Sequence, residues 1–166
     1  MKRKIKTYLA GPIGDVKIEK AKDWREYLRG ELAKMGIGVL NPLDKYGESL
    51  PVVRSKISNW TRYGNIDSLR QLVSTKIIPQ DLKMVESSDF VTLWLPNERE
   101  AEVCGSYGEI TLAFWIGIPV YIVTSRKLKP LNIPKWAVGC STKIFKNWKD
   151  YLIYVKENWV DDDEEK

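Results

Sequence analysis

The sequence predicts an α/β protein: a single-domain, Rossmann- or flavodoxin-like parallel sheet of five strands with helices on both faces. Short apolar runs typical of buried strands alternate with amphipathic stretches typical of helices, and this order favours a parallel sheet covered on both sides. The 166 residues are enough for one sizeable core and too few for two ordinary domains. We therefore expect one domain over residues 1–160 and a disordered acidic tail over residues 161–166.

A strand, a helix and a second strand are expected first. Residues 4–10 form an apolar run that ends at Gly11-Pro12. The next stretch has one apolar face with a helical period, which predicts a helix ending at Gly36. A short strand is expected over residues 37–40. The apolar helix face consists of Ala21, Trp24, Leu28, Leu32 and Met35.

The stretch from residue 43 to residue 64 gives a weaker pattern. Pro51 favours a loop there, and residues 58–63 favour a short helix or a lid. Residues 66–84 have a helical pattern, with a break expected at Pro79, because proline is tolerated only in the first turn of a helix.

The second half of the chain predicts three more strands, over residues 89–95, 119–124 and 141–145. Helices are expected over residues 106–116 and 148–157. Ligands of such sheets bind beyond the carboxyl ends of the strands, so the loops that follow the strands are where a site is expected. Before the last strand a loop is expected, bracketed by Pro130, Pro134 and Gly139.

Composition excludes several kinds of chemistry. The chain has no histidine, which rules out the usual zinc sites and every Ser–His or Cys–His nucleophile. Its two cysteines, Cys104 and Cys140, offer neither a disulfide framework nor a metal-ligand spacing, so neither a metal nor a cofactor is expected. The net charge of +5 is scattered, which favours a basic surface over a nucleic-acid site. With no signal peptide or membrane span in the pattern, a cytoplasmic protein is expected.

Acid–base chemistry must therefore use Asp, Glu, Tyr or Lys, and three such residues stand out. Glu109 follows two glycines in the first turn of a predicted helix, although Ser106 and Glu109 also have the spacing of a capping box. This segment alone favours the capping box. Asp81 can interact with a helix dipole, and Tyr8 can be an ordinary core tyrosine at the end of the first strand.

In their order along the chain, these segments resemble the nucleoside 2-deoxyribosyltransferases. The resemblance extends from Tyr8 to about Trp136. Its most specific parts are Gly105-x-x-Gly108-Glu109 and the segment over residues 129–136, and they shift the interpretation of Glu109 from cap to catalysis. The other matching parts are Tyr8-Leu9-Ala10-Gly11, Pro42-Leu43-Asp44, and Asp81-Leu82 one helix before Ser88-Asp89.

The resemblance implies a role for each residue. Glu109 would attack the anomeric carbon of a deoxyribonucleoside, Asp81 would contact the base and supply its proton, and Tyr8 would orient Glu109. Asn132 would bind the sugar, commonly from a neighbouring subunit, which implies a homo-oligomer with a shared active site. Glu102 is nearest to an acidic residue of the family, out of register by a residue or so. The expected substrate-binding residues are Gly11, Asp44, Glu102, Gly105, Ser106 and Asn132.

The expected partners are a deoxyribonucleoside and a free nucleobase, with no nucleic acid and no membrane. Two other functions stay open. A deoxynucleoside 5′-monophosphate hydrolase would need phosphate donors in the first loop, where residues 11–15 offer few, although Ser125 and Arg126 could compensate. A non-catalytic nucleotide-binding module would use Glu109 only as a cap. Tyr46, where the family commonly has a polar amide, leaves the choice between purine and pyrimidine bases open.

Overall fold

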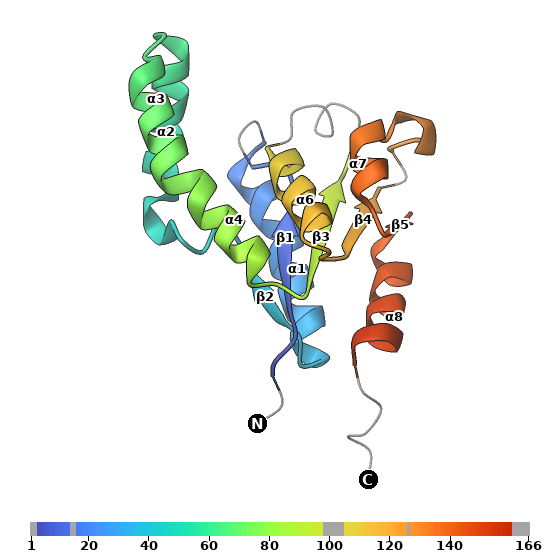
Figure 1. Cartoon of the computed structure of the whole chain (residues 1–166). Helices are drawn as coiled ribbons and strands as arrows, with labels where there is room; N and C mark the ends of the chain where they lie inside the picture. Colours follow the sequence, from blue (N-terminus) through green and yellow to red (C-terminus); the bar gives the residue numbers. More distant parts are fainter. Residues whose placement is uncertain (1–2, 14–15, 98–104, 126, 161–166) are drawn as a thin grey trace.

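The structure is a computed structural model that describes residues 3–13, 16–97, 105–125 and 127–160 (Figure 1). Within them a single sheet of five parallel strands has the order β2-β1-β3-β4-β5, which confirms the predicted fold class. The predicted tail and Glu102 lie outside the described residues. The strands are β1 (Lys6–Ala10), β2 (Gly38–Leu40), β3 (Phe90–Leu95), β4 (Val120–Thr124) and β5 (Lys143–Phe145).

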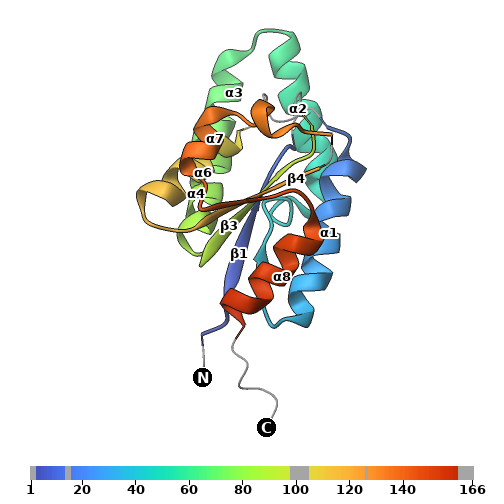
Figure 2. The same ribbon diagram turned by 90° about the vertical axis from the view of Figure 1, so that its right-hand side faces the viewer.

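Helices cover both faces of this sheet (Figure 2). The helices α1 (Ile18–Lys34) and α8 (Trp148–Trp159) pack on one face. On the other face lie α4 (Ile78–Glu86), α6 (Ser106–Trp115) and α7 (Lys135–Cys140). Successive strand residues point to opposite faces, so Tyr8 joins the α4–α6–α7 layer and Leu9 the α1–α8 layer.

A switch point of the sheet lies between β1 and β3. The chain leaving β1 passes to α1 on one face, and the chain leaving β3 leads to α6 on the other. The loops beyond these two carboxyl ends therefore part, and in open parallel sheets the resulting crevice is where ligands bind.

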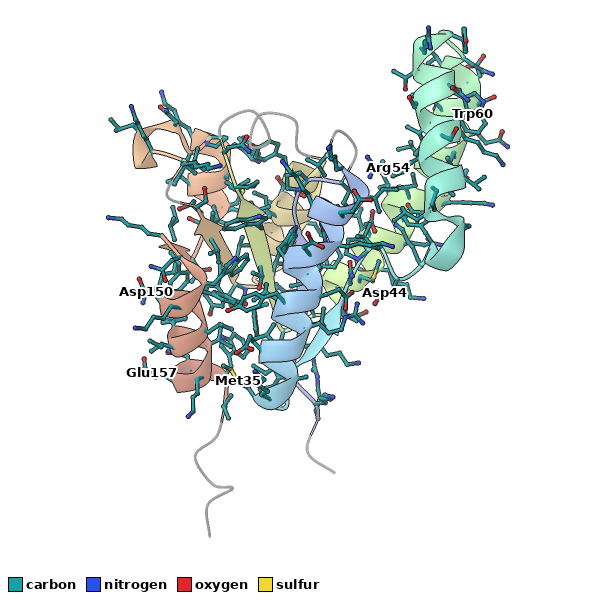
Figure 3. The ribbon with its side chains drawn as sticks, turned by 180° about the vertical axis from the view of Figure 1, so that it is seen from behind. Met35, Asp44, Arg54, Trp60, Asp150 and Glu157 are labelled. Carbon is teal, nitrogen blue, oxygen red and sulfur yellow. The ribbon has the colours of Figure 1, made fainter. Side chains whose placement is uncertain are left out.

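Between β2 and β3 the chain forms a helical arm, residues 50–77, that stands away from the sheet (Figure 1). After the 3-10 turn η1 (Gly47–Ser49), the arm consists of α2 (Leu50–Arg62), α3 (Ile66–Leu72) and a π-helical turn (Val73–Ile77) that runs into α4. Leu50 is the buried residue of α2, and α3 has none. Trp60 lies far along the arm from the sheet (Figure 3).

Two loop predictions were wrong because proline was interpreted as a loop former where it begins a helix. Pro51 lies in the first turn of α2, and Pro134 is the N-cap residue of α7. The first backbone N–H groups of a helix have no intrahelical partner, so a proline costs nothing there. Pro79 does lie in the first turn of α4, as predicted, and the expected break takes the form of the π-helical turn just before it.

No helix in the described part of the chain combines the length and the hydrophobicity needed to cross a bilayer.

Candidate active site

β1 and α6 bring Tyr8 and Glu109 together, although 101 positions separate them in the sequence. The Tyr8 hydroxyl donates a hydrogen bond of 2.7 Å to Oε1 of Glu109. The other oxygen, Oε2, is buried and accepts no hydrogen bond from any described residue. A buried carboxylate oxygen without a donor is costly in the folded state, and such atoms call for a functional explanation. One oxygen of Glu109 is thus held in place and the other is available.

The capping-box interpretation of Ser106 and Glu109 is wrong. The N-cap of α6 is Gly105, which makes no side-chain capping bond, and Ser106 is already the first residue of the helix. A capping box needs the serine at the N-cap and the glutamate three residues later. Here Glu109 instead points across to β1.

The burial of Glu109 changes its acidity. The pKa of the carboxyl is raised from 4.5 to about 7, chiefly by desolvation; the hydrogen bond from Tyr8 and the charge of Arg25 oppose this rise, and the charge of Asp81 adds to it. Burial, followed by the charge of Glu109, raises the pKa of Tyr8 well above 10. Tyr8 therefore keeps its proton and remains a donor, while Glu109 ionises near neutral pH.

Asp81 enters the same site from the first turn of α4, paired with a lysine that the sequence analysis missed. Lys45 Nζ lies 2.6 Å from Oδ1 of Asp81, and only 12% and 13% of the two side chains are exposed. Desolvation raises the pKa of Asp81, and the hydrogen bond and charge of Lys45 oppose this. The Lys45 ammonium also lies 4.9 Å from the centre of the Tyr46 ring. Asp81 is close enough to raise the pKa of both Tyr8 and Glu109.

Arg25 is a second cation that the sequence analysis missed. Its guanidinium is fully buried and donates to the carbonyl oxygens of Gly11, at 3.0 Å, and Ala21, at 2.7 Å. Its charge lowers the pKa of Asp81 and Glu109. A helical wheel places Arg25 beside the apolar face, so nothing in the sequence marks it as buried.

Both the backbone conformation and the surrounding space favour glycine at position 11. Its φ of 155° is unusual for residues with a side chain, and an added Cβ would lie 2.9 Å from the Trp24 ring and 3.3 Å from the Trp94 carbonyl oxygen. Gly105 is different: its angles are helical, and an added Cβ would meet no described atom within 4 Å. Binding of substrate at these glycines stays a prediction.

Asp44 and Asn132 are two further residues that the sequence predicts to bind substrate, and this stays a prediction. Asp44 is half exposed and accepts hydrogen bonds of 2.7 and 2.8 Å from Arg29 on α1. The Asn41 side chain also donates to Asp44, at 3.2 Å. Asn132 is exposed at the end of the 3-10 turn η3 (Pro130–Asn132), which its own N–H closes on the Lys129 carbonyl. Ser106 is buried at the start of α6, beside Glu109.

Comparison with known proteins supports the parallel α/β fold and assigns the chain to no family. The chain matches no protein-family model and no curated protein. Among solved structures, it is similar to a conserved protein from Enterococcus faecalis V583, with a TM-score of 0.60 over 93% of this chain and 99% of that one. At 15% sequence identity, the likeness extends to the parallel α/β fold alone.

Proposed function

We propose that the protein cleaves the N-glycosidic bond of a 2′-deoxyribonucleoside and transfers the sugar to another nucleobase, as the nucleoside 2-deoxyribosyltransferases do. The observation that carries this proposal is the Tyr8–Glu109 pair: a hydroxyl holds one carboxylate oxygen and leaves the other, buried, without a donor. A carboxylate presented in this way can act as a nucleophile toward an anomeric carbon.

The reaction needs two groups with opposite tasks. Oε2 of ionised Glu109 bonds to the anomeric carbon as the bond to the base nitrogen breaks, and the electron pair stays on the base, which takes up a proton. The Lys45 ammonium donates a hydrogen bond of 2.6 Å to Asp81, so a proton can pass from Lys45 through Asp81 to the departing base. A ring nitrogen of a second base then attacks the anomeric carbon as the ester bond to Glu109 breaks, and its proton returns through Asp81 to Lys45.

The test is incubation of the protein with deoxyinosine or thymidine, with and without a free acceptor base. Chromatography follows both the released base and any new nucleoside. A transferase forms the new nucleoside only with acceptor present, whereas a hydrolase releases free deoxyribose in both cases. If neither substrate is consumed over a range of bases and pH values, the proposal is wrong.

A first prediction concerns Asp81. Asp81→Asn is expected to slow a deoxyribonucleoside with a poor leaving base by about 10²–10⁴-fold, the usual contribution of a general acid. A substrate with an activated leaving group needs no proton, so it should be slowed much less. The measurement compares kcat for the two substrates in both enzymes. Equal slowing would limit Asp81 to positioning the substrate, and Asp67→Asn on the exposed arm is the matched control.

We also propose a homo-oligomer, supported by an exposed apolar surface. This surface, named the α6–α7 face, joins the end of α6 to α7 and η3, and a 2.8 Å hydrogen bond from the Trp136 indole to Thr111 connects the two helices. Exposed apolar surface of this kind is typical of protein interfaces. Asn132 directly follows Leu131 on it, so a second copy covering the face would approach Asn132. The α6–α7 face consists of Phe114, Trp115, Leu131 and Trp136, exposed by 59%, 82%, 96% and 63%.

Trp148, the first residue of α8, does not extend this surface, because its side chain belongs to the core. Its ring lies 5.9 Å from that of Trp24 and 4.6 Å from that of Trp94, measured between centroids. The amphipathic pattern of α8 could not reveal this, because both partners come from distant elements.

A second prediction tests whether the site is shared. An inactive Glu109→Ala chain and an inactive Asn132→Ala chain are mixed under conditions in which subunits exchange. If one subunit lends Asn132 to another, some mixed sites contain both intact residues, and activity returns to about a quarter of the wild-type level in a dimer. Sizing confirms the exchange. A mixture that exchanges and stays inactive would show that Asn132 serves its own chain.

A further inference from the structure

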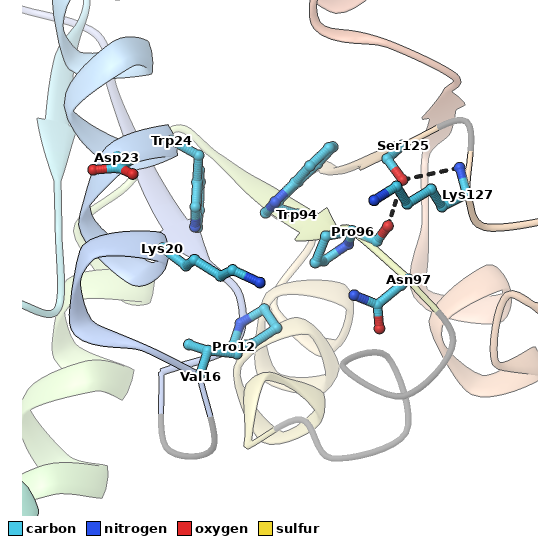
Figure 4. Close-up of a pocket in the computed structure, with 10 residues that line it drawn as sticks. All are labelled: Pro12, Val16, Lys20, Asp23, Trp24, Trp94, Pro96, Asn97, Ser125 and Lys127. Atoms are coloured by element: carbon cyan, nitrogen blue, oxygen red, sulfur yellow. Dashed lines mark hydrogen bonds between the residues drawn. The ribbon is translucent and has the colours of Figure 1, made fainter.

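A cavity lies beyond the carboxyl ends of β1, β3 and β4, on the α1 side of the sheet (Figure 4). Its volume is about 340 Å³, within the range of small-ligand sites. None of Tyr8, Asp81 and Glu109 lines it. The walls come from Pro12 after β1, from the first turns of α1, from the end of β3 and from the loop after β4.

Two indole rings form the back of this cavity, those of Trp24 and Trp94. Trp148 packs against both, at 5.9 and 4.6 Å between ring centroids, and the Arg25 guanidinium lies 4.2 Å from the centre of the Trp24 ring. The rings are therefore held in place from behind. In Figure 4 the nitrogen edges of both indoles face the space between them, and no described residue accepts a hydrogen bond from either N–H.

Two lysines add positive charge from opposite sides. Lys20 extends from α1 toward the indoles, and Lys127 extends from the loop after β4 toward Trp94 (Figure 4). Neither ammonium forms an ion pair with a described residue. Among the described lining residues only Asp23 is acidic, and its carboxylate lies on the far side of the Trp24 ring from the Lys20 ammonium in this view.

The position of Lys20 is unfavourable without a ligand. It lies in the first turn of α1, where the helix dipole disfavours a cation, and Glu19 in the same turn does not line the cavity. The N-cap residue, Lys17, makes no side-chain capping bond. An anion in the cavity would meet the Lys20 charge and the positive end of the helix dipole together.

We propose that this cavity, lined by Trp24, Trp94, Lys20 and Lys127, binds the phosphate group of a phosphate monoester. The donors approach from several directions, which suits the tetrahedral oxygens of a phosphate better than a planar carboxylate, whose geometry matches a single fork of donors. The volume leaves room for the organic part of the ester beside the phosphate. The site is separate from the proposed transfer reaction and does not depend on it.

The test measures binding, so inactivity in the transfer assay does not affect it. The probes are inorganic phosphate, ribose 5-phosphate and deoxythymidine 5′-monophosphate, with thymidine as the uncharged counterpart. Titration calorimetry gives each Kd, and the indole N–H resonances of Trp24 and Trp94, assigned from Trp24→Phe and Trp94→Phe, report the place of binding. We expect both resonances to shift in a saturable way with at least one phosphate probe, and thymidine to leave them unchanged. The tightest probe distinguishes free phosphate from a sugar phosphate or a nucleotide.

Lysine variants decide the outcome, because Lys20 and Lys127 are exposed and their loss leaves the core intact. Lys20→Met and Lys127→Met should each weaken phosphate binding by about tenfold or more, the usual effect of losing a charge-assisted hydrogen bond. Lys22→Met, on the same helix and outside the cavity, has the same net charge and should bind as the wild type does. The proposal is overturned if no phosphate probe shifts the two indoles, if thymidine shifts them equally, or if Lys20→Met and Lys22→Met bind alike.

Discussion

Glu109→Gln is expected to abolish sugar transfer and, at pH 8, to make the folded protein more stable. The amide cannot form the ester, so kcat should fall by about 10³-fold or more. The substitution also removes a carboxylate that is costly to ionise in the folded protein, because burial raises its pKa to about 7. Few substitutions at an ordinary structural residue would inactivate and stabilise together.

The pH dependence of this gain in stability follows from the upward shift of the Glu109 pKa. The unfolded chain ionises Glu109 near its ordinary pKa of 4.5, while the folded protein keeps the proton until about pH 7. The free energy of unfolding of the wild type therefore decreases as the pH rises from 4.5 to about 7, and this contribution is constant above about pH 7. Glu109→Gln should gain about 1–3 kcal/mol at pH 8 and almost nothing at pH 4.

Urea unfolding at the two pH values measures this difference, and Glu157→Gln on the exposed face of α8 is the control (Figure 3). In the wild type, kcat should also rise with pH through about 7, because only the ionised carboxylate attacks. A Glu109→Gln protein that is active, or that is equally destabilised at pH 4 and pH 8, would contradict the role of Glu109.

Lys45→Met is expected to have the largest effect on stability, a loss of about 3–5 kcal/mol near neutral pH. Lys45 and Asp81 form a pair at 2.6 Å with both side chains largely buried, and removal of one partner leaves an uncompensated charge. Without the ammonium, desolvation raises the pKa of Asp81 further above 3.8. The loss should therefore be complete above that raised pKa and should shrink as the pH falls toward 4, where Asp81 takes up a proton.

A double-mutant cycle isolates the pair. Lys45→Met/Asp81→Asn removes both charges and should recover part of the stability that Lys45→Met loses. Lys83→Met, an exposed lysine on α4 beside the site, is the matched control and should change the unfolding free energy little. If the single and double variants lose the same stability, the ion pair does not stabilise Asp81, and packing of the Lys45 stem explains the loss.

The strands and the two long outer helices of this protein were predictable because their signals are local. The apolar run that became β3, buried on both faces, needs no knowledge of its neighbours. The same is true of α1, whose apolar face was predicted with Ala21, Trp24, Leu28 and Leu32, all of them buried. Local signals also gave wrong predictions at Pro51 and Pro134, which were expected in loops and instead begin helices. A proline has the same local pattern in both cases, and the packing of the neighbouring turns decides between a loop and a helix.

By itself the sequence determined the fold class and drew attention to Tyr8, Asp81 and Glu109. Only the tertiary structure decided that the Glu109 side chain bonds to Tyr8 instead of capping its own helix. Only it paired Asp81 with Lys45, 36 positions earlier, and buried Arg25 beneath Gly11. The physical reason is the same in each case. Strand and helix periodicity depends on neighbours in sequence, whereas these contacts depend on the strand order, which places β1 and β3 side by side, and on the packing of α6 against both strands and of α4 against α6.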